Sequence, residues 1–288
     1  MPNSPVVPTV RRRRLGGTLK RLRKAAGLTL DEAAGAMGWI GPKMSKIENA
    51  AQSIRPGDVA TLLKLYGVDD PEVSTALENL ARDAGKKGWW QTYSGLVSAS
   101  YADYVSLESD AEQIYEWSPL LIPGLLQTSA YARETMTGAT TSRAPHEIAA
   151  LAELRLARQS VLTRHDKPLE LCAVVHEAAL HQRFARRPAT MREQLRRLLD
   201  ATDMPNVTFQ LVPLTSALHP GMAGGFTVAA FPAPTPDVVL LENLCGATYV
   251  EGDDAIPFAK AFDRIRAAAL SAEDSLARIA EMEEGHRK

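Results

Sequence analysis

Apolar residues recur at helical spacing through the first part of the chain. Leu15, Leu19 and Leu22 form the inward stripe of one predicted helix. Thr29 is the predicted N-cap of the next helix, because its hydroxyl can accept a free amide hydrogen while Glu32 reaches back to complete a capping box. The pattern therefore predicts short amphipathic helices in close succession.

A turn and a third helix follow. Gly38 stands where the second helix needs a left-handed residue, and Pro42 suits the first turn of the helix after it. Met44 and Ile47 would lie on the packed face of this third helix, and small or basic residues on its outer face. Two short helices joined by a turn in this way, with the second helix exposed on one face, fit the major groove of DNA. Paired amphipathic helices are also common in ordinary helical bundles.

The flanking segments LGGTLKRLRKAAGLTL and RPGDVATLLKLYGV supply the other helices of a five-helix unit in the expected order. Over residues 15–68 the chain resembles the Xre-type helix-turn-helix family of phage repressors, which implies that this unit binds double-stranded DNA. The chain departs from that family at the start of the third helix. Many members have Ser or Thr where Ile40 stands, and Ile40 cannot cap the helix.

This departure shifts the expected base contacts further along the third helix. The candidates for base contacts are Lys43, Ser45, Lys46, Asn49 and Pro42. The candidates for phosphate contacts are Arg11, Arg12, Arg13, Arg14, Thr29 and Arg55. Four adjacent arginines before the first helix can lie along phosphates or enter a minor groove, or can simply begin a solvated helix.

The predicted organisation has four parts. Residues 1–14 form a flexible basic arm, residues 15–69 the helix-turn-helix domain, residues 70–90 a connecting helix and linker, and residues 91–288 a larger α+β domain. The tandem tryptophans Trp89 and Trp90 are expected to be packing anchors at the boundary.

The larger domain begins with helical patterns and turns to strands only later. Helices are predicted at residues 98–116, 125–135 and 146–165, near 177–183, at 190–201 with a Thr190–Glu193 capping box, and at 255–270 and 271–284. The segments LELCAVV, NVTFQLVP, GGFTVAAF and DVVLLENL are predicted strands. Because helices and strands do not alternate regularly, we expect a small, mostly antiparallel sheet in an α+β domain.

The larger domain and the linker before it also carry ordered landmarks: Trp89, LES at 107–109, IPGLLQT at 122–128, YAR at 131–133, LRLARQ at 154–159, HEAAL at 176–180 and a final AFDRIRAAALS. This region is similar to the C-terminal domain, of uncharacterised function, in actinobacterial antitoxin-like regulators, a group that includes WhiJ-like proteins. The resemblance implies a small neighbour-encoded partner protein, with the pair acting as a repressor module or a toxin–antitoxin-like unit.

Charge divides the chain in the same way. Residues 1–60 hold eleven Lys and Arg against four Asp and Glu, a net charge of +7, and the rest of the chain carries −8, which gives the total of −1. A basic head attracts phosphate, whereas an acidic remainder is better suited to a protein or a ligand. The 45% apolar composition excludes a disordered chain, and without an apolar segment for a membrane span or signal peptide we expect a cytoplasmic protein.

Candidate catalytic and metal motifs are weak. HEAALH places His176 and His181 five residues apart, about 140° around a helix, whereas a zinc motif needs four. Cys172 and Cys245 form no CxxC motif and are expected to be buried reduced thiols. The loop GMAGG is not a phosphate-binding motif, and there is no GxSxG elbow. We therefore expect no enzyme activity, metal or cofactor.

The leading hypothesis is a transcriptional regulator, a homodimer on a pseudo-palindromic operator, whose larger domain dimerises and binds the small partner protein. One alternative is an antitoxin that acts mainly by sequestering that protein. Another is a ligand-sensing regulator, with a small molecule bound among the aromatic side chains of Tyr101, Tyr104, Tyr115 and Trp117, although such residues at helical spacing are usually core.

Overall fold

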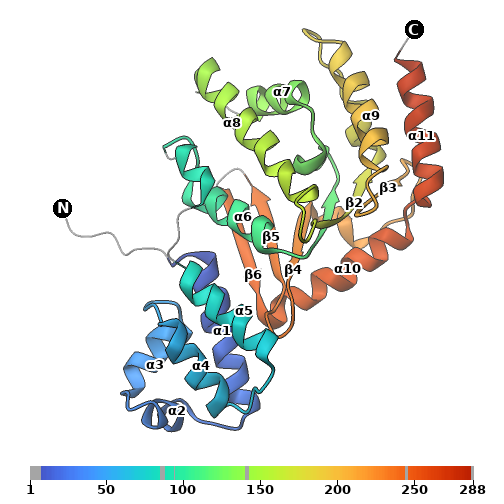
Figure 1. Ribbon diagram of the computed structural model, residues 1–288. Helices are drawn as coiled ribbons and strands as arrows, with labels where there is room; N and C mark the ends of the chain where they lie inside the picture. The colour runs from blue at the N-terminus through green and yellow to red at the C-terminus, as the bar shows by residue number, and fades with distance from the viewer. Residues whose placement is uncertain (1–7, 85–87, 94, 140–142, 244–245, 287–288) are drawn as a thin grey trace. The chain divides into compact units, whose positions relative to one another are not determined.

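The computed structural model describes residues 8–84, 88–93, 95–139, 143–243 and 246–286 (Figure 1). The chain divides into two compact units. The first comprises residues 1–89 with 231–236, and the second comprises residues 90–230 with 237–288. Each unit has its own hydrophobic core.

Over its described residues the first unit contains the expected five helices, which confirms the predicted all-α head. They are α1 (Val10–Ala25), α2 (Leu30–Ala36), α3 (Gly41–Glu48), α4 (Pro56–Leu65) and α5 (Pro71–Asp83). Buried side chains from α1, α3, α4 and α5 meet in one core. The helix predicted to be a connector, α5, therefore takes part in this core through Leu77, which is 1% exposed.

The helix α1 begins earlier than predicted. It starts at Val10, so five of the residues assigned to a flexible arm, Val10 to Arg14, are helical. Thr9 is the N-cap, and its hydroxyl accepts a hydrogen bond from the backbone N–H of Arg12 at 3.3 Å. The cap stabilises the first turn and so extends the helix through the arginines.

The second unit combines helices with a six-stranded sheet. Its main elements are α6 (Ala99–Asp110), β1 (Gln113–Ser118), α7 (Ser129–Ala139), α8 (Pro145–Arg158), β2 (Glu170–His176), α9 (Ala189–Ala201), β3 (Val207–Val212), β4 (Phe226–Ala230), β5 (Val238–Asn243), β6 (Gly246–Glu251), α10 (Ile256–Ala267) and α11 (Ala272–Gly285). Short 3-10 turns lie at Trp89–Tyr93, Gly124–Leu126, Gln159–Leu162, Glu177–His181, Pro220–Ala223 and Gly252–Ala255.

The strand order is β3-β2-β1-β4-β5-β6. The neighbours β1 and β2, and β2 and β3, pair in parallel, and the other three pairs are antiparallel. Helix α10 packs on one face of the sheet, where Phe262 and Ile265 meet Trp117, Val174 and other strand residues (Figure 1). The predicted α+β class with a mostly antiparallel sheet is confirmed.

Four strands were predicted correctly and two were not. The segments predicted as strands became β2 to β5, whereas β1 lies where the sequence predicts the end of a helix. The error has a physical reason, because Ile114 and Trp117 are both buried and their three-residue spacing also suits a helix face. The sixth strand, β6, joins the edge of the sheet and had no apolar alternation strong enough to predict it.

Some helix boundaries also differ. The α-helix predicted for residues 146–165 ends at Arg158 and continues as a 3-10 turn, and the helix predicted near 177–183 is only the turn Glu177–His181. The Thr190–Glu193 capping box is wrong. Pro188 is the N-cap of α9, and Thr190 is buried inside the helix at 2% exposure.

Candidate nucleic-acid interface

The start of α2 and the turn that follows it are built as the sequence predicts. The hydroxyl of Thr29 accepts from the backbone N–H of Glu32 at 3.2 Å, and the carboxylate of Glu32 accepts from the backbone N–H of Thr29 at 2.8 Å. This confirms the capping box. Gly38 then adopts a φ of 65°, a left-handed conformation that glycine tolerates best, and the chain turns into α3.

Helix α3 is fixed from behind by close packing. Met44 and Ile47 are 0% and 2% exposed and belong to the core of the first unit. Gly16 of α1 faces the end of α3, where an added Cβ would lie 2.6 Å from the backbone oxygens of both Ile47 and Glu48. Only a glycine allows the two helices to approach this closely.

A buried ion pair adds to this packing. The Arg23 guanidinium of α1 donates to both carboxylate oxygens of Glu48 at 2.6 and 2.9 Å, and a third donation at 2.8 Å reaches the carbonyl of Leu28. The hydrogen bond with Glu48 raises the pKa of Arg23 above its ordinary value. Because both charged groups are almost fully buried, removal of either one would leave its partner uncompensated. Sequence reasoning missed this pair, since nothing local links residues 25 positions apart.

The outer face of α3 carries most of the predicted base contacts. Pro42, Lys46 and Asn49 are exposed, and Ser45 is half-buried. The Asn49 amide donates to the Ser45 hydroxyl at 3.3 Å, which aligns these two side chains along the face. The fifth candidate, Lys43, is half-buried.

Lys43 is held by an aromatic ring. Its ammonium group lies 3.6 Å from the centre of the Trp39 ring, a cation–π contact within the turn that precedes α3. The neighbouring Ile40 is the N-cap of α3, makes no side-chain capping bond and is 70% exposed. The entrance of α3 therefore presents an apolar side chain to solvent.

The residues predicted to contact phosphate differ in how freely their side chains could reach DNA. Arg55 is exposed at the N-cap of α4. The Thr29 hydroxyl donates to the Glu32 carboxylate at 2.6 Å, which places a negative charge where a phosphate would bind. This arrangement does not favour a phosphate role for Thr29.

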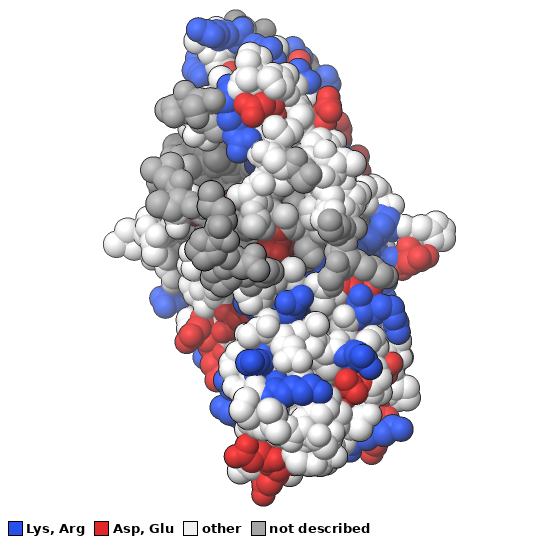
Figure 2. All heavy atoms as spheres, turned by 90° about the vertical axis from the view of Figure 1, so that its left-hand side faces the viewer, with Lys and Arg blue, Asp and Glu red and all other residues white. Residues whose placement is uncertain are grey.

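The arginines of α1 are partly engaged with the protein. Arg11 donates to the carbonyl of Asp83 at 3.4 Å, and Arg13 donates to the carbonyl of Pro8 at 2.7 Å. Arg12 is half-buried. Arg14 is only 5% exposed, so its predicted contact with phosphate is not available in this conformation. In Figure 2, Lys and Arg side chains form several separate groups over the first unit instead of one continuous field.

In the second unit, the sequence landmarks converge on a buried network. The Arg158 guanidinium of α8 donates to both carboxylate oxygens of Glu108 of α6 at 2.9 and 2.7 Å, and to the Tyr101 hydroxyl at 2.7 Å. Its centre lies 4.7 Å from the ring of Tyr104. Arg158 and Glu108 are 3% and 1% exposed, so the pair is structural.

The IPGLLQT segment is held by polar side chains of the same landmarks. The Gln127 amide donates to the carbonyl of Ile122 at 2.7 Å, and Gln159 donates to the carbonyl of Gln127 at 2.7 Å. Tyr131 accepts from the backbone N–H of Ile122 at 3.2 Å, and Gln194 of α9 donates to the carbonyl of Leu126 at 2.8 Å. These bonds satisfy a non-helical segment that is buried between helices.

The aromatic residues considered for a ligand do not share one cavity wall. Tyr101 and Tyr104 contact each other edge to face at 6.4 Å between ring centres. Tyr115 instead packs on Phe262 of α10 at 5.4 Å, on the opposite side of the sheet core, and Trp117 is 2% exposed. These contacts are those of packing residues, which does not favour a common ligand site.

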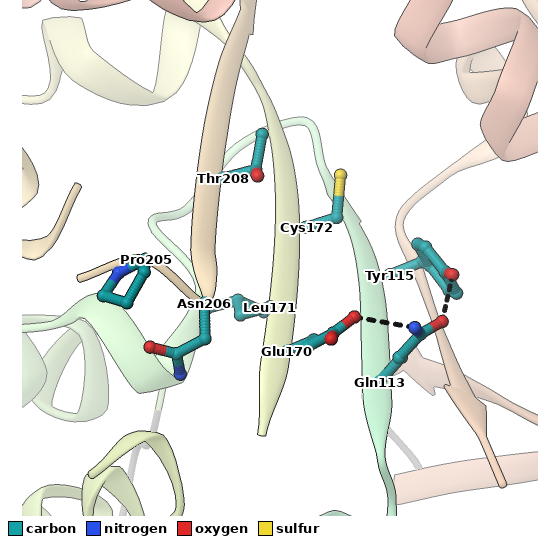
Figure 3. A pocket seen from close by; sticks show the side chains of 8 residues that line it. All are labelled: Gln113, Tyr115, Glu170, Leu171, Cys172, Pro205, Asn206 and Thr208. Atoms are coloured by element: carbon teal, nitrogen blue, oxygen red, sulfur yellow. Dashed lines mark hydrogen bonds between the residues drawn. The ribbon is translucent and has the colours of Figure 1, made fainter. Parts of the chain in front are cut away.

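A shallow pocket of about 270 Å³ lies over the amino-terminal ends of β1, β2 and β3 (Figure 3). Its lining includes Cys172, Tyr115 and Asn206. The Gln113 amide donates to the Glu170 carboxylate at 2.7 Å and accepts from the Tyr115 hydroxyl (Figure 3). Because these groups bond to one another, the pocket offers few groups to a ligand.

The two histidines of the HEAALH segment contact different partners. His176 accepts from the backbone N–H of Ala178 at 3.2 Å through Nδ1, and His181 lies 3.7 Å from the carboxylate of Glu177. The segment forms a 3-10 turn, so the helical comparison made from the sequence does not apply to it. Within the described residues, no group of three or more His, Cys, Asp or Glu side chains is arranged to hold a metal ion.

The end of the sheet where β1, β2 and β3 finish carries exposed apolar side chains. Because β1, β2 and β3 are parallel and β4 is antiparallel to β1, the segments that follow these three strands and the segment that precedes β4 meet at the same end of the sheet. The segment that follows β2 carries Glu177, which accepts from the backbone N–H of Leu214 at 3.1 Å. Residues 119–128 and 213–225 contain no Asp, Glu, Lys or Arg. We call this surface the apolar edge, and its exposed side chains are Leu120, Leu121, Leu214, Leu218 and Met222.

Comparison with known proteins identifies two families. Residues 14–76 match the family described as a helix-turn-helix domain. Residues 101–281 match the family described as a domain of unknown function, DUF5753. No curated protein and no solved structure matches the chain. Among the described residues, no helix is long and apolar enough to cross a membrane.

Proposed function

The chain belongs to the DUF5753 family, and from the helix-turn-helix domain that precedes its DUF5753 region we propose that it is a sequence-specific, DNA-binding transcriptional regulator. The observation that carries the proposal is the outer face of α3. This face exposes Pro42, Lys46 and Asn49 on a helix whose opposite face is fixed in the core. A helix fixed in this way can be inserted into a major groove without rearrangement.

The base-reading set is Lys46, Asn49 and Ser45, with Pro42 and Lys43 beside them. Lysine is the side chain of this set that pairs with guanine O6 and N7, and the Asn49 amide is suited to adenine. Arg55, with Arg11, Arg12 and Arg13, holds the phosphate backbone. Thr29 and Arg14 are the weakest members of the predicted phosphate set, for the reasons given above.

Two substitutions distinguish these roles. Lys46→Ala is expected to weaken binding to a selected duplex by about 1–3 kcal/mol and to leave binding to random DNA nearly unchanged. Arg55→Ala is expected to weaken both, because a phosphate contact is independent of sequence. Fluorescence anisotropy on duplexes enriched from a genomic fragment pool would measure both affinities. Equal losses for Lys46→Ala on the two DNAs would remove Lys46 from the base-reading set.

The apolar edge supports the proposal that the second unit makes the regulator a homodimer. A two-fold interface brings the same surface of two copies together, and the exposed apolar side chains of the apolar edge would be buried against one another in it. A dimer would place two α3 helices on a pseudo-palindromic operator. Light scattering of Leu218→Glu should then show a monomer, whereas Ile256→Glu, at an exposed apolar position on α10, should leave the dimer intact.

A monomeric wild-type chain would end the dimer proposal and leave the apolar edge for the small neighbour-encoded partner protein. In that antitoxin-like reading, sequestration of the partner is the main activity and DNA binding provides feedback. Co-expression with the adjacent small protein, followed by pull-down of the full chain and of Leu218→Glu, tests it. Failure of the full chain to retain the protein would contradict this second candidate function.

A further inference from the structure

Ile40 works against the local stability of α3 in two ways. It occupies the N-cap, where Ser, Thr, Asp or Asn would accept a free amide hydrogen, and it makes no such bond. Its side chain is also 70% exposed, so it gains little from burial in the core. A residue that breaks a local rule within an otherwise consistent element indicates a functional position.

The place of Ile40 defines what it can touch. It immediately precedes α3, and the first residues of a recognition helix are those that approach base edges in the major groove. The nearby Lys43 is drawn onto the Trp39 ring at 3.6 Å. Within residues 39–43 the exposed side chains are then Ile40 and Pro42, and both are apolar, while the exposed Asp31 carboxylate of α2 lies beside Gly41.

We propose that Ile40 recognises the 5-methyl group of a thymine in the operator, an inference that rests on the proposed DNA-binding function of α3. Isoleucine has no hydrogen-bonding group in its side chain, so it can distinguish bases only by apolar contact. Thymine is the base whose major-groove edge carries a methyl group. The contact specifies one base position and adds to the polar contacts made by Lys46 and Asn49.

The test removes the methyl group from the DNA instead of altering only the protein. Duplexes are first enriched from a random-sequence pool with the full chain. Each thymine of the enriched sequence is then replaced singly by uracil, which pairs identically but lacks the methyl group. At one thymine per half-site, uracil is expected to weaken wild-type binding about fourfold, the effect of one buried methyl group.

Two variants of the protein are compared with wild type on the same thymine and uracil duplexes. Ile40→Ser provides a capping hydroxyl, so it should fold at least as well as wild type while losing the apolar contact. It should bind the thymine and uracil duplexes with equal affinity. Ile40→Val keeps a branched apolar side chain and should retain most of the preference for thymine.

The outcomes separate the two claims. If no sequence is enriched, both the proposed function and the role of Ile40 are overturned. If a sequence is enriched but no uracil changes the affinity of wild type, the role of Ile40 alone is overturned. The same holds if Ile40→Ser keeps the full preference for thymine, because the methyl group is then recognised by another residue.

Discussion

Two glutamates show how differently single carboxylates are placed in this chain. Hydrogen bonds from the Thr29 side chain and backbone lower the pKa of Glu32 in an exposed capping box. The pKa of Glu116 of β1 is raised to about 7, mainly by burial and secondly by the negative charge of the neighbouring Glu242 carboxylate. The charged form of Glu32 thus stabilises its helix, whereas the surroundings of Glu116 favour its neutral, protonated form.

Glu116 should make the second unit less stable as pH rises. Its pKa in the unfolded chain is near the ordinary 4.5, so between that value and about 7 the unfolded state loses its proton first and stability falls. Glu116→Gln should remove this decline and be more stable than wild type above pH 7, by about 1–3 kcal/mol. Urea unfolding at pH 5 and pH 8 measures the difference.

The matched control is Glu193→Gln, a change at an exposed glutamate of α9. It should leave the pH dependence of unfolding unchanged. If Glu116→Gln shows the same pH dependence as wild type, the burial of this carboxylate does not control it.

Single residues were predictable where their partners are near in sequence. The Thr29–Glu32 capping box follows from a three-residue spacing, and Ile40 could be recognised as a residue unable to cap. The burial of Arg14 could not be predicted, because four adjacent arginines look alike in sequence. Their exposure depends on the face of α1 that each occupies, and thus on where the helix begins.

The position of α3 depends on how closely it approaches α1 at Gly16. Gly16→Ala places a methyl group 2.6 Å from two backbone oxygens, so α3 must shift and its amide protons should exchange faster. Gly17→Ala is the matched control, because the same added methyl group meets nothing within 4 Å there. By helix propensity alone Gly17→Ala should stabilise α1 by about 1 kcal/mol.

Hydrogen exchange in the full chain, read at the amides of α3, compares the two variants directly. Faster exchange in Gly16→Ala and slower or unchanged exchange in Gly17→Ala is the expected result. Equal exchange in both variants would show that α3 does not require this close approach.

In the second unit, one buried ion pair joins α6 to α8 beside their apolar packing. Arg158→Met leaves the carboxylate of Glu108 buried without its cation, which should lower the free energy of unfolding by about 3–5 kcal/mol. The double variant Arg158→Met with Glu108→Gln should recover part of that loss, because no charge then remains buried. Chemical denaturation of the single and double variants measures the coupling, and a double variant no more stable than Arg158→Met would contradict it.

Helices and strands could be predicted from the sequence where a local pattern of residues specifies them. The buried strands β2 to β5 are runs of apolar and β-branched residues bounded by turns, and all four were predicted. Strand β1 was missed because it follows α6 directly and shares its apolar spacing. Long-range partners such as Arg23 with Glu48, or Gln194 with Leu126, have no local signal and required the structure.

For the whole molecule, the division of charge predicts how salt affects DNA binding. The first 60 residues carry a net charge of +7 and the remainder −8, so only the head should release counterions from DNA. The affinity should fall steeply with salt, and Arg55→Ala should reduce the slope of log affinity against log salt by about one. Titrations at several salt concentrations measure this slope, and an affinity independent of salt would contradict the proposed phosphate contacts.

Several of the landmarks that mark the second unit in the sequence are interior residues. Glu108, Arg158 and Gln127 are at most 3% exposed, and they bond to one another or to buried backbone, while the half-buried Gln159 bonds to the carbonyl of Gln127. Chains that share these residues therefore inherit a common scaffold and remain free to diverge outside it. Exchanging the exposed segments outside this scaffold between two such proteins should therefore leave each hybrid able to form the same set of interior bonds.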